Sequence, residues 1–271
     1  IKADGLALGK GVIIAQNEEE AKAALHSIME DKIFGESGAP VVVEEFLTGP
    51  EVSVLAFTDG KTLKPMVSSM DHKRAYDGDK GPNTGGMGTI SPNPFYTDEV
   101  AQQCMETIFL PTGQAMSAEG RPFKGCLYFG LMLTPNGPKV IEYNSRFGDP
   151  ETQVVLPLLK TDLLTVMQAV ESETLGSLTV EWRHASAACV ILASGGYPGH
   201  HDKGKPISLP ASAPGNVPIY HAGDRLDEHR PLVTSGVRVL RVTPTGPTFR
   251  QALHHASPAA RAVAFYGTHT R

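Results

Sequence analysis

A hydrophobic segment near the middle of the chain carries polar side chains at every second position. The run "KVIEYNSRFGDPE" (139–151) has the β-branched and aromatic residues of a strand, interrupted by Glu142, Asn144 and Arg146. Because side chains alternate along a strand, we expect these three to share one face with Val140. Glu142 and Asn144 would offer oxygen ligands to Mg²⁺, and Arg146 a fork for phosphate or carboxylate. A half-solvated antiparallel strand explains the run equally well, so the rest of the chain must decide.

A glycine-rich segment opens the chain. In "IKADGLALGKG" (1–11), the glycines would let backbone amides approach an anion, and the two lysines add positive charge. The spacing is not that of the GxxxxGK[ST] phosphate loop, because neither serine nor threonine follows Lys10. We expect a phosphate-covering loop between a first strand and a second strand at 12–15, with a flexible hairpin turn as the alternative.

An acidic hinge follows in "VVVEEFLTGPEVSV" (41–54), where a strand ends, crosses a tight turn and resumes at Glu51. A glutamate in an apolar hinge can accept from the amino group of a base, and the adjoining backbone can bind the base edge. Glu51 can accept from two ribose hydroxyls. The alternative is a solvated acidic turn.

The segment "SSMDHKRAYDGDKGPNTGGMG" (68–88) reads as a long polar loop over residues 71–94. Loops of this length are usually functional or disordered. Lys73 and Arg74 could hold phosphate, and the amides from Thr84 to Gly88 could form an anion nest. The four segments follow one another along the chain, and together they predict an ATP site between two sheets.

The elements that must position these residues alternate between strand and helix patterns. Asn17 is a good N-cap for a helix over 17–31, and Thr97 for a helix over 97–118 that bends near Pro111. Strands are expected at 40–47, 51–59, 61–70, 187–193, 217–221 and 237–243, a hairpin at 125–145, and helices at 151–172 and from 248. The pattern relaxes near residue 180, which predicts two domains.

The composition excludes several classes of protein. The chain has 271 residues, 41% hydrophobic and 20% charged, with a net charge of −5. Mild acidity without a basic run argues against nucleic acid or a membrane as a partner. Cys104, Cys126 and Cys189 form no metal or disulfide pattern, and the longest apolar stretch is too short to cross a bilayer. We therefore expect a cytoplasmic protein.

Several longer motifs resemble one family, the phosphoribosylamine–glycine ligases (glycinamide ribonucleotide synthetases). They are "IKADGLALGKGV", "EEFLTGPE", "DHKRAYDGDKGPNTGGMG", "VIEYNSRFGDPETQ", "ASGGYPGHHDKGKPI", "YHAG" and "LVTSGVRVLRVT". The resemblance implies an α+β class chain: an ATP-grasp fold of two α+β subdomains sandwiching ATP (1–178), then a small mixed α/β C-terminal domain (179–271). It also implies that this chain, which starts without methionine, is a fragment lacking the family's N-terminal domain. Val237, where the family usually has glycine, and Pro258 inside the last helix depart from the pattern.

The resemblance also implies roles for individual residues. The substrates would be glycine and 5-phosphoribosylamine, joined with ATP and Mg²⁺ (or Mn²⁺) through a glycyl phosphate. ATP would be bound by Lys2, Gly5, Gly9, Lys10, Gly11, Glu44, Glu45, Phe46, Leu47 and Glu51. Metal ligands would be Glu142 and Asn144, and catalytic residues Arg146, Lys73 and Asp71. Substrate would be bound by His72, Asn83, Thr84, Gly85, Gly86 and Asp149.

Two other interpretations stay open. Another ATP-grasp carboxylate–amine ligase or carboxylase would share the ATP residues, although not "GPNTGGMG" together with "RFGDPETQ". A nucleotide-binding module without catalysis is also possible for a truncated chain. His200 and His201 lie in a glycine-rich loop without a spaced partner, so a solvated loop is expected there rather than a metal site.

Overall fold

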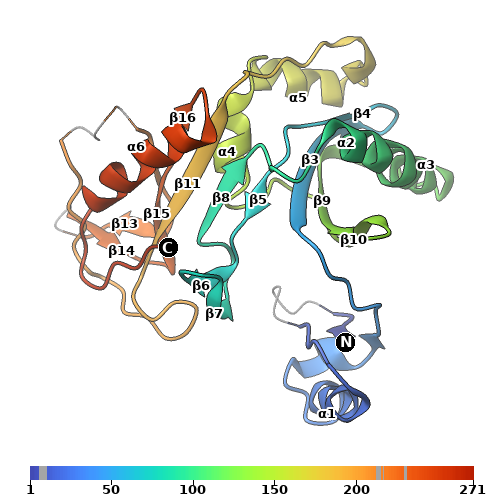
Figure 1. The fold of residues 1–271 in the computed structure, drawn as a ribbon, viewed down its shortest axis with the longest axis horizontal. Helices are drawn as coiled ribbons and strands as arrows, with labels where there is room; N and C mark the ends of the chain where they lie inside the picture. The colour runs from blue at the N-terminus through green and yellow to red at the C-terminus, as the bar shows by residue number, and fades with distance from the viewer. Residues whose placement is uncertain (6–10, 212–214, 216, 229–230) are drawn as a thin grey trace. The chain divides into compact units, whose positions relative to one another are not determined.

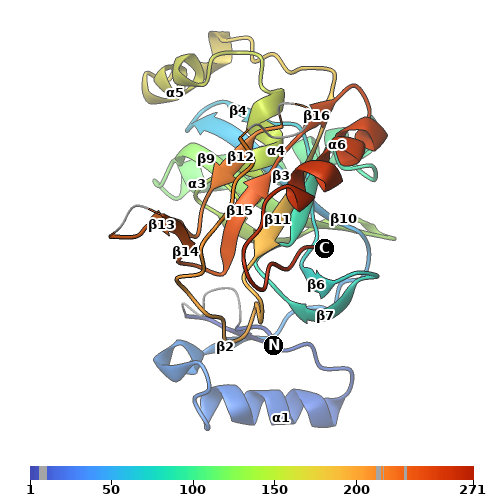
Figure 2. The same cartoon turned by 90° about the vertical axis from the view of Figure 1, so that its left-hand side faces the viewer.

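The computed structural model describes residues 1–5, 11–211, 215, 217–228 and 231–271. The chain forms two compact units, Ile1–Thr48 and Gly49–Arg271. Figure 1 and Figure 2 show the elements of both. In the described part of the chain, no helix has the length and apolar character needed to cross a membrane.

The described strands are short except in the central sheets. They are β1 (Lys2–Ala3), β2 (Val41–Val42), β3 (Glu51–Asp59), β4 (Leu63–Pro65), β5 (Met70–Asp71), β6 (Arg74–Tyr76), β7 (Lys80–Asn83), β8 (Gly88–Ser91), β9 (Lys124–Thr134), β10 (Gly137–Asn144), β11 (Ser186–Ala193), β12 (Ile219–His221), β13 (Asp224–Leu226), β14 (Leu232–Thr234), β15 (Arg238–Val242) and β16 (Thr245–Gly246). The helices are α1 (Glu18–Met29), η1 (Gly35–Gly38), α2 (Asp98–Cys104), the π-helical η2 (Met105–Phe109), α3 (Leu110–Ala118), α4 (Thr152–Val155), η3 (Leu156–Leu158), α5 (Leu163–Glu171), η4 (Leu175–Ser177) and α6 (Phe249–Arg261).

The first unit holds a minimal sheet and one helix. β1 pairs antiparallel with β2, and Lys2 also forms a bridge with Val12, so the opening segment does fold back on itself. The predicted strand at 12–15 is wrong, because only that single bridge forms. Asn17 caps α1 as expected, accepting from the amide of Glu20 at 2.9 Å. The helix buries Ala24 and Ile28.

The second unit contains a four-stranded antiparallel sheet in the order β10-β9-β3-β4. One face of β3 and β9 packs on α2 and η2 through Val54, Phe109 and Phe129. The other face packs on α5 through residues such as Leu55 and Val166. Because both faces are covered, "EVSVLAFTD" has the near-continuous hydrophobic character of a buried strand.

A six-stranded sheet forms the rest of the second unit, in the order β12-β15-β11-β8-β5 with β16 also paired to β11. β11 lies between β8 and β15, and α6 packs against it (Figure 1). Ala188 and Leu192 on β11 meet alanines of α6 in two small apolar clusters. Strands from 70–91 and strands from beyond 186 therefore share one sheet.

The two sheets of the second unit share a core. Its largest cluster combines Leu55 and Tyr128 from the four-stranded sheet with Cys189 and Ile191 from the six-stranded sheet, bridged by Val155 of α4. Each large apolar side chain buried in this way stabilises the fold by about 1.5–3 kcal/mol. The sheets are thus fixed against each other, which also fixes the polar segments between them.

Several boundaries differ from those predicted. Residues 71–94 are not one loop, because they contain β6, β7 and β8. The strand predicted at 40–47 ends at Val42, the one at 61–70 is two short strands, and the helix at 151–172 is broken between Val155 and Leu163. Thr97 caps α2 as expected, but the irregularity in the 98–118 helix is the π-helical turn η2, just before Pro111. α6 continues past Pro258, as expected.

Candidate functional site

The strand that carries the predicted metal ligands contains a bulge. Val140 pairs with Leu131, and Glu142 with Gly130, so Ile141 is the extra residue. A bulge changes the alternation of faces, so Val140 packs among the apolar residues beside α2 rather than with Glu142. The prediction that Val140 shares the face of Glu142 is therefore wrong.

Beyond the bulge the alternation holds. Tyr143 points toward the helices, where its ring contacts Phe129 edge-on at 5.6 Å. Glu142 and Asn144 are paired opposite Gly130 and Tyr128, so they lie on the other face together. The strand ends at Asn144, and Arg146 lies outside it, with Nη1 donating to the carbonyl of Phe147 at 2.9 Å. Strand alternation therefore does not place Arg146.

Gly130 makes room for Glu142. A Cβ atom at Gly130 would lie 2.9 Å from Cγ of Glu142 and 3.4 Å from the ring of Tyr128. The Glu142 side chain thus crosses the strand directly above Gly130, and its exposed carboxylate reaches solvent. Among the described residues, no three His, Cys, Asp or Glu side chains gather to hold a metal ion. A cation held by Glu142 and Asn144 would need phosphate or water for its other ligands, which suits Mg²⁺.

A charged pair lies on the same face of the sheet. Lys73 Nζ donates to Glu51 Oε2 at 2.7 Å, and both residues line a small cavity together with Glu142. Burial alone would lower the pKa of Lys73. The negative charge of Glu51, with smaller contributions from Asp71 and Glu142, raises this pKa above its ordinary value. The structure therefore brings together Glu51, Lys73 and Glu142, which came from three separate predicted segments.

Two buried carboxyl groups lie behind this pair. Burial, with the nearby charge of Glu151, raises the pKa of Asp71 well above its ordinary value. Asp71 Oδ1 is buried without a hydrogen-bond partner and lies against Gly86, where a Cβ atom would approach it to 2.5 Å. Burial also raises the pKa of Glu151. Its Oε1 accepts from Tyr128 at 3.1 Å, and the tyrosine hydroxyl contacts Ser53 Oγ at 2.8 Å.

The nucleotide residues predicted in the first unit lie on irregular backbone. Lys2 Nζ pairs with Glu44 Oε1 at 3.0 Å, and both side chains are partly exposed. Residues 43–47, including Glu45, Phe46 and Leu47, follow the end of β2, and Phe46 is exposed. Gly5 packs closely on Ser37, and the carbonyl of Gly11 accepts from the amide of Ala3. Gly9 and Lys10 lie outside the described residues.

The predicted substrate loop is held by its own hydrogen bonds. The Thr84 amide and hydroxyl both donate to the carbonyl of Lys73, and the Gly86 amide donates to the Thr84 hydroxyl. The Gly85 amide donates to the Tyr197 hydroxyl at 2.6 Å. Met87 likewise donates to the carbonyl of His72. These four amides already have protein acceptors, so the expected anion nest over 84–88 is wrong. Asn83 ends β7 and is exposed.

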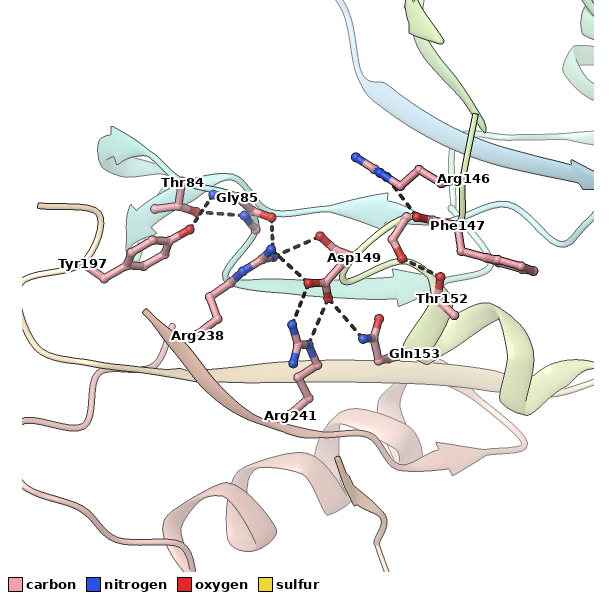
Figure 3. Close-up of polar contacts among 12 residues, drawn as sticks. Thr84, Gly85, Arg146, Phe147, Asp149, Thr152, Gln153, Tyr197, Arg238 and Arg241 are labelled. Atoms are coloured by element: carbon pink, nitrogen blue, oxygen red, sulfur yellow. Dashed lines mark hydrogen bonds and ion pairs between the residues drawn. The ribbon is translucent and has the colours of Figure 1, made fainter. Parts of the chain in front are cut away.

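Asp149 is the centre of a polar cluster that the sequence did not predict (Figure 3). Arg241 donates to both of its carboxylate oxygens, at 3.0 and 2.6 Å. Arg238 donates to Oδ2 and to the backbone carbonyl, each at 3.0 Å, and Gln153 adds a bond to Oδ1 at 3.1 Å. An arginine inside the apolar run "VRVLRV" was the only sequence signal for Arg241.

Comparisons with known proteins match the chain to one family. Residues 1–152 match the family described as "Phosphoribosylglycinamide synthetase, ATP-grasp (A) domain", and residues 187–271 match its "C domain". The phosphoribosylamine–glycine ligase of Halalkalibacterium halodurans is 50% identical over 93% of this chain and 58% of its own length. The trifunctional purine biosynthetic protein adenosine-3 of Gallus gallus is 50% identical over 99% of this chain and 27% of its own.

A solved structure is also similar. The crystal structure of phosphoribosylamine–glycine ligase from Thermotoga maritima superimposes with a TM-score of 0.87 at 36% identity, covering 100% of this chain and 67% of that one. The chain thus spans only part of the length of the relatives it matches.

Proposed function

The chain belongs to the phosphoribosylglycinamide synthetase family, and we therefore propose that it supplies the ATP-dependent ligase centre joining glycine to 5-phosphoribosylamine. The products would be glycinamide ribonucleotide, ADP and phosphate. The observation that supports this most directly is the meeting of Glu51, Lys73 and Glu142 on one face of the four-stranded sheet. A carboxylate with an adjacent amide oxygen for metal, beside a lysine of raised pKa, suits the phosphates of a metal–nucleotide complex.

The first step forms glycyl phosphate. A glycine carboxylate oxygen attacks the γ-phosphorus, and the bond between that phosphorus and the bridging oxygen breaks, which releases ADP. Glu142 and Asn144 would hold Mg²⁺, or Mn²⁺, whose charge neutralises the phosphates. Lys73 and Arg146 would offset the charge of the transferred group, so catalysis rests on positioning and electrostatics.

The second step forms the amide. The nitrogen of 5-phosphoribosylamine attacks the acyl carbon, the bond from that carbon to the phosphate oxygen breaks, and the amine loses a proton. We assign that proton to Asp71, because its Oδ1 is buried without a hydrogen-bond partner and because burial, with Glu151 nearby, makes this carboxylate a stronger base than an exposed one. His72 and Asn83–Gly86 would bind the substrates beside it.

The nucleotide would be contacted by the remaining predicted residues. Glu44 and the backbone of Glu45 and Leu47 would bind adenine, Phe46 would lie beside the base, and Glu51 would bind the ribose. Lys2, with the glycine-rich loop around Gly5 and Gly11, would contact the phosphates. The region of the relatives that this chain does not span includes, in our proposal, the N-terminal domain that binds most of phosphoribosylamine.

Trapping with hydroxylamine tests the first step. The chain, with MgATP and glycine, should form glycine hydroxamate together with ADP, and alanine in place of glycine should give little. A hydroxamate formed only from another acid would identify a different ATP-grasp ligase. ATP binding without any hydroxamate would identify a nucleotide-binding module. Without the N-terminal domain the chain should form no glycinamide ribonucleotide, because the amine is not positioned.

A further inference from the structure

One arginine joins two segments of the candidate site that are far apart in the sequence. Arg238, the first residue of β15, donates through Nη1 to the carbonyls of Gly85 and Asp149. Its Nη2 donates to the Asp149 carboxylate at 3.0 Å. The guanidinium is therefore bound at once to the substrate loop and to the turn that follows Arg146 (Figure 3).

This arginine side chain is largely buried, and the polar groups around it have hydrogen-bond partners. The Arg238 side chain is 17% exposed and that of Arg241 only 8%. Arg241 holds the same carboxylate through two parallel bonds, a geometry in which ion pairs are stronger than at an open surface. On the other side, Tyr197 accepts from the amide of Gly85. The peptide groups of residue 85 are thus anchored by two residues from beyond 186.

The anchored loop in turn lies against the proposed base. Gly86 has φ of +110°, and a Cβ atom there would meet Asp71 Oδ1 at 2.5 Å and Pro150 at 2.7 Å. The backbone of residue 86 therefore fits closely between Asp71 and the turn that holds Asp149. A shift of this loop would change the surroundings of the Asp71 carboxyl group directly.

We propose that Arg238 is a positioning residue that holds the Thr84–Gly86 loop at a fixed distance from the Arg146–Asp149 turn. Asp149, which the sequence suggested as a substrate ligand, acts in this proposal through the two arginines that occupy its oxygens. The inference rests on the proposed ligase function. It gives the C-terminal part of the chain a role in aligning glycine and the transferred phosphoryl group, without contact with either.

The test compares Arg238→Ala, Arg238→Lys and Arg225→Ala in the hydroxamate assay. Arg225 is an exposed arginine on β13, so its substitution is the matched control and should change nothing. Arg238→Ala should lower kcat/KM for glycine roughly a hundredfold, because misplacement of reacting groups by about 1 Å has effects of this size. The dissociation constant of MgATP should stay unchanged. Lysine keeps the charge but not the fork, so Arg238→Lys should recover only part of the activity.

Two outcomes would overturn the inference. One is a folded Arg238→Ala protein with the kcat/KM of the wild type. The other is a parallel loss of MgATP binding in both Arg238 variants, which would indicate general support of the fold. If the wild type forms no glycine hydroxamate, the ligase proposal fails, and amide hydrogen exchange at Gly85 and Gly86 decides about Arg238. The exchange should be roughly tenfold faster in Arg238→Ala, and equal rates would contradict the positioning role.

Discussion

The two units of the chain hold their candidate residues in opposite ways. In the first unit, β1 and β2 have two residues each, and Lys2 and Glu44 form a partly exposed ion pair. In the second unit, β3 and β9 have nine and eleven residues, and the carboxyl group of Glu151 is buried with Tyr128.

We infer from this difference that the first unit mainly sets the affinity for ATP and the second unit mainly sets the rate of the reaction. An exposed ion pair stabilises a protein by about 0–1 kcal/mol, so breaking the Lys2–Glu44 pair to let both side chains contact a nucleotide, as we propose, would cost little. Charged groups fixed in a packed sheet are already oriented toward the charge that develops in the transition state. This preorganisation lowers the activation barrier of the reaction. We therefore expect substitutions in the first unit to change mainly the affinity for ATP, and those in the second unit, apart from the proposed ribose ligand Glu51, to change turnover.

The largest effect is expected for Glu142→Ala. It removes the only carboxylate of the proposed metal pair, so metal-dependent ATP turnover with glycine should fall roughly 10²–10³-fold at saturating ATP. Thermal unfolding should scarcely change, because this side chain is exposed. Glu106→Ala, an exposed glutamate of η2, is the control. Turnover like that of the wild type would remove the metal assignment.

Lys2→Met should act on binding instead. A hydrogen bond to a charged group is worth about 1.5–3 kcal/mol, so calorimetry should show MgATP binding weakened roughly tenfold or more. Turnover at saturating ATP should stay near that of the wild type. If the maximal turnover fell while affinity stayed constant, the division of roles between the two units would be wrong.

Gly130→Ala should have an intermediate effect. The new methyl group would lie 2.9 Å from Cγ of Glu142, so the glutamate must shift. We expect the Mg²⁺ concentration for half-maximal turnover to rise roughly tenfold, the lower end of the effect of losing an outer-shell group from a metal site. Gly113→Ala in α3 is the matched control, because that position has open space and alanine favours a helix. Identical metal dependence in both variants would contradict the placement of Glu142.

The smallest effect should be a change in how stability depends on pH. The pKa of Glu151 is raised in the folded state, so the folded protein holds this proton more tightly than the unfolded chain. Its contribution to stability is therefore greatest below the unfolded pKa and falls as pH rises through the folded pKa.

Glu151→Gln cannot ionise, so it should gain stability relative to the wild type as pH rises from about 4 to 8. Urea unfolding at several pH values would measure the difference, with the exposed Glu119→Gln as a control. If the free energies of unfolding of Glu151→Gln and the wild type changed in parallel with pH, burial would not raise the pKa of Glu151.

Local signals explain what the sequence predicted correctly. Asn17 and Thr97 cap their helices through bonds to amides three residues away, and β9 and β10 are joined by a short turn. Such features depend on neighbouring residues. β7 and β8 were missed because "KGPN" and "GTIS" have no strand pattern of their own, and β8 is a strand because it pairs with β11, about a hundred residues later.

The residue types of the candidate site could be predicted from the sequence, but the contacts set by distant partners could not. Glu51, Lys73 and Glu142 are charged residues in or beside strands, and their types indicate ribose, phosphate and metal contacts, respectively. The bulge at Ile141 is set by pairing with β9, so no periodicity in the strand itself reveals it. Arg238 and Tyr197 escaped because their partners lie 89 to 153 residues away.

The shared six-stranded sheet has a consequence for any shortened form of this protein. β11 pairs with β8 along one edge and with β15 along the other. A chain ending near residue 178 would leave β8 with a row of unpaired backbone amides and carbonyls. Such an edge is a template for strands of other molecules. The shortened chain should therefore self-associate through β8. By pairing with β8, residues 186–193 would prevent this aggregation in the longer chain.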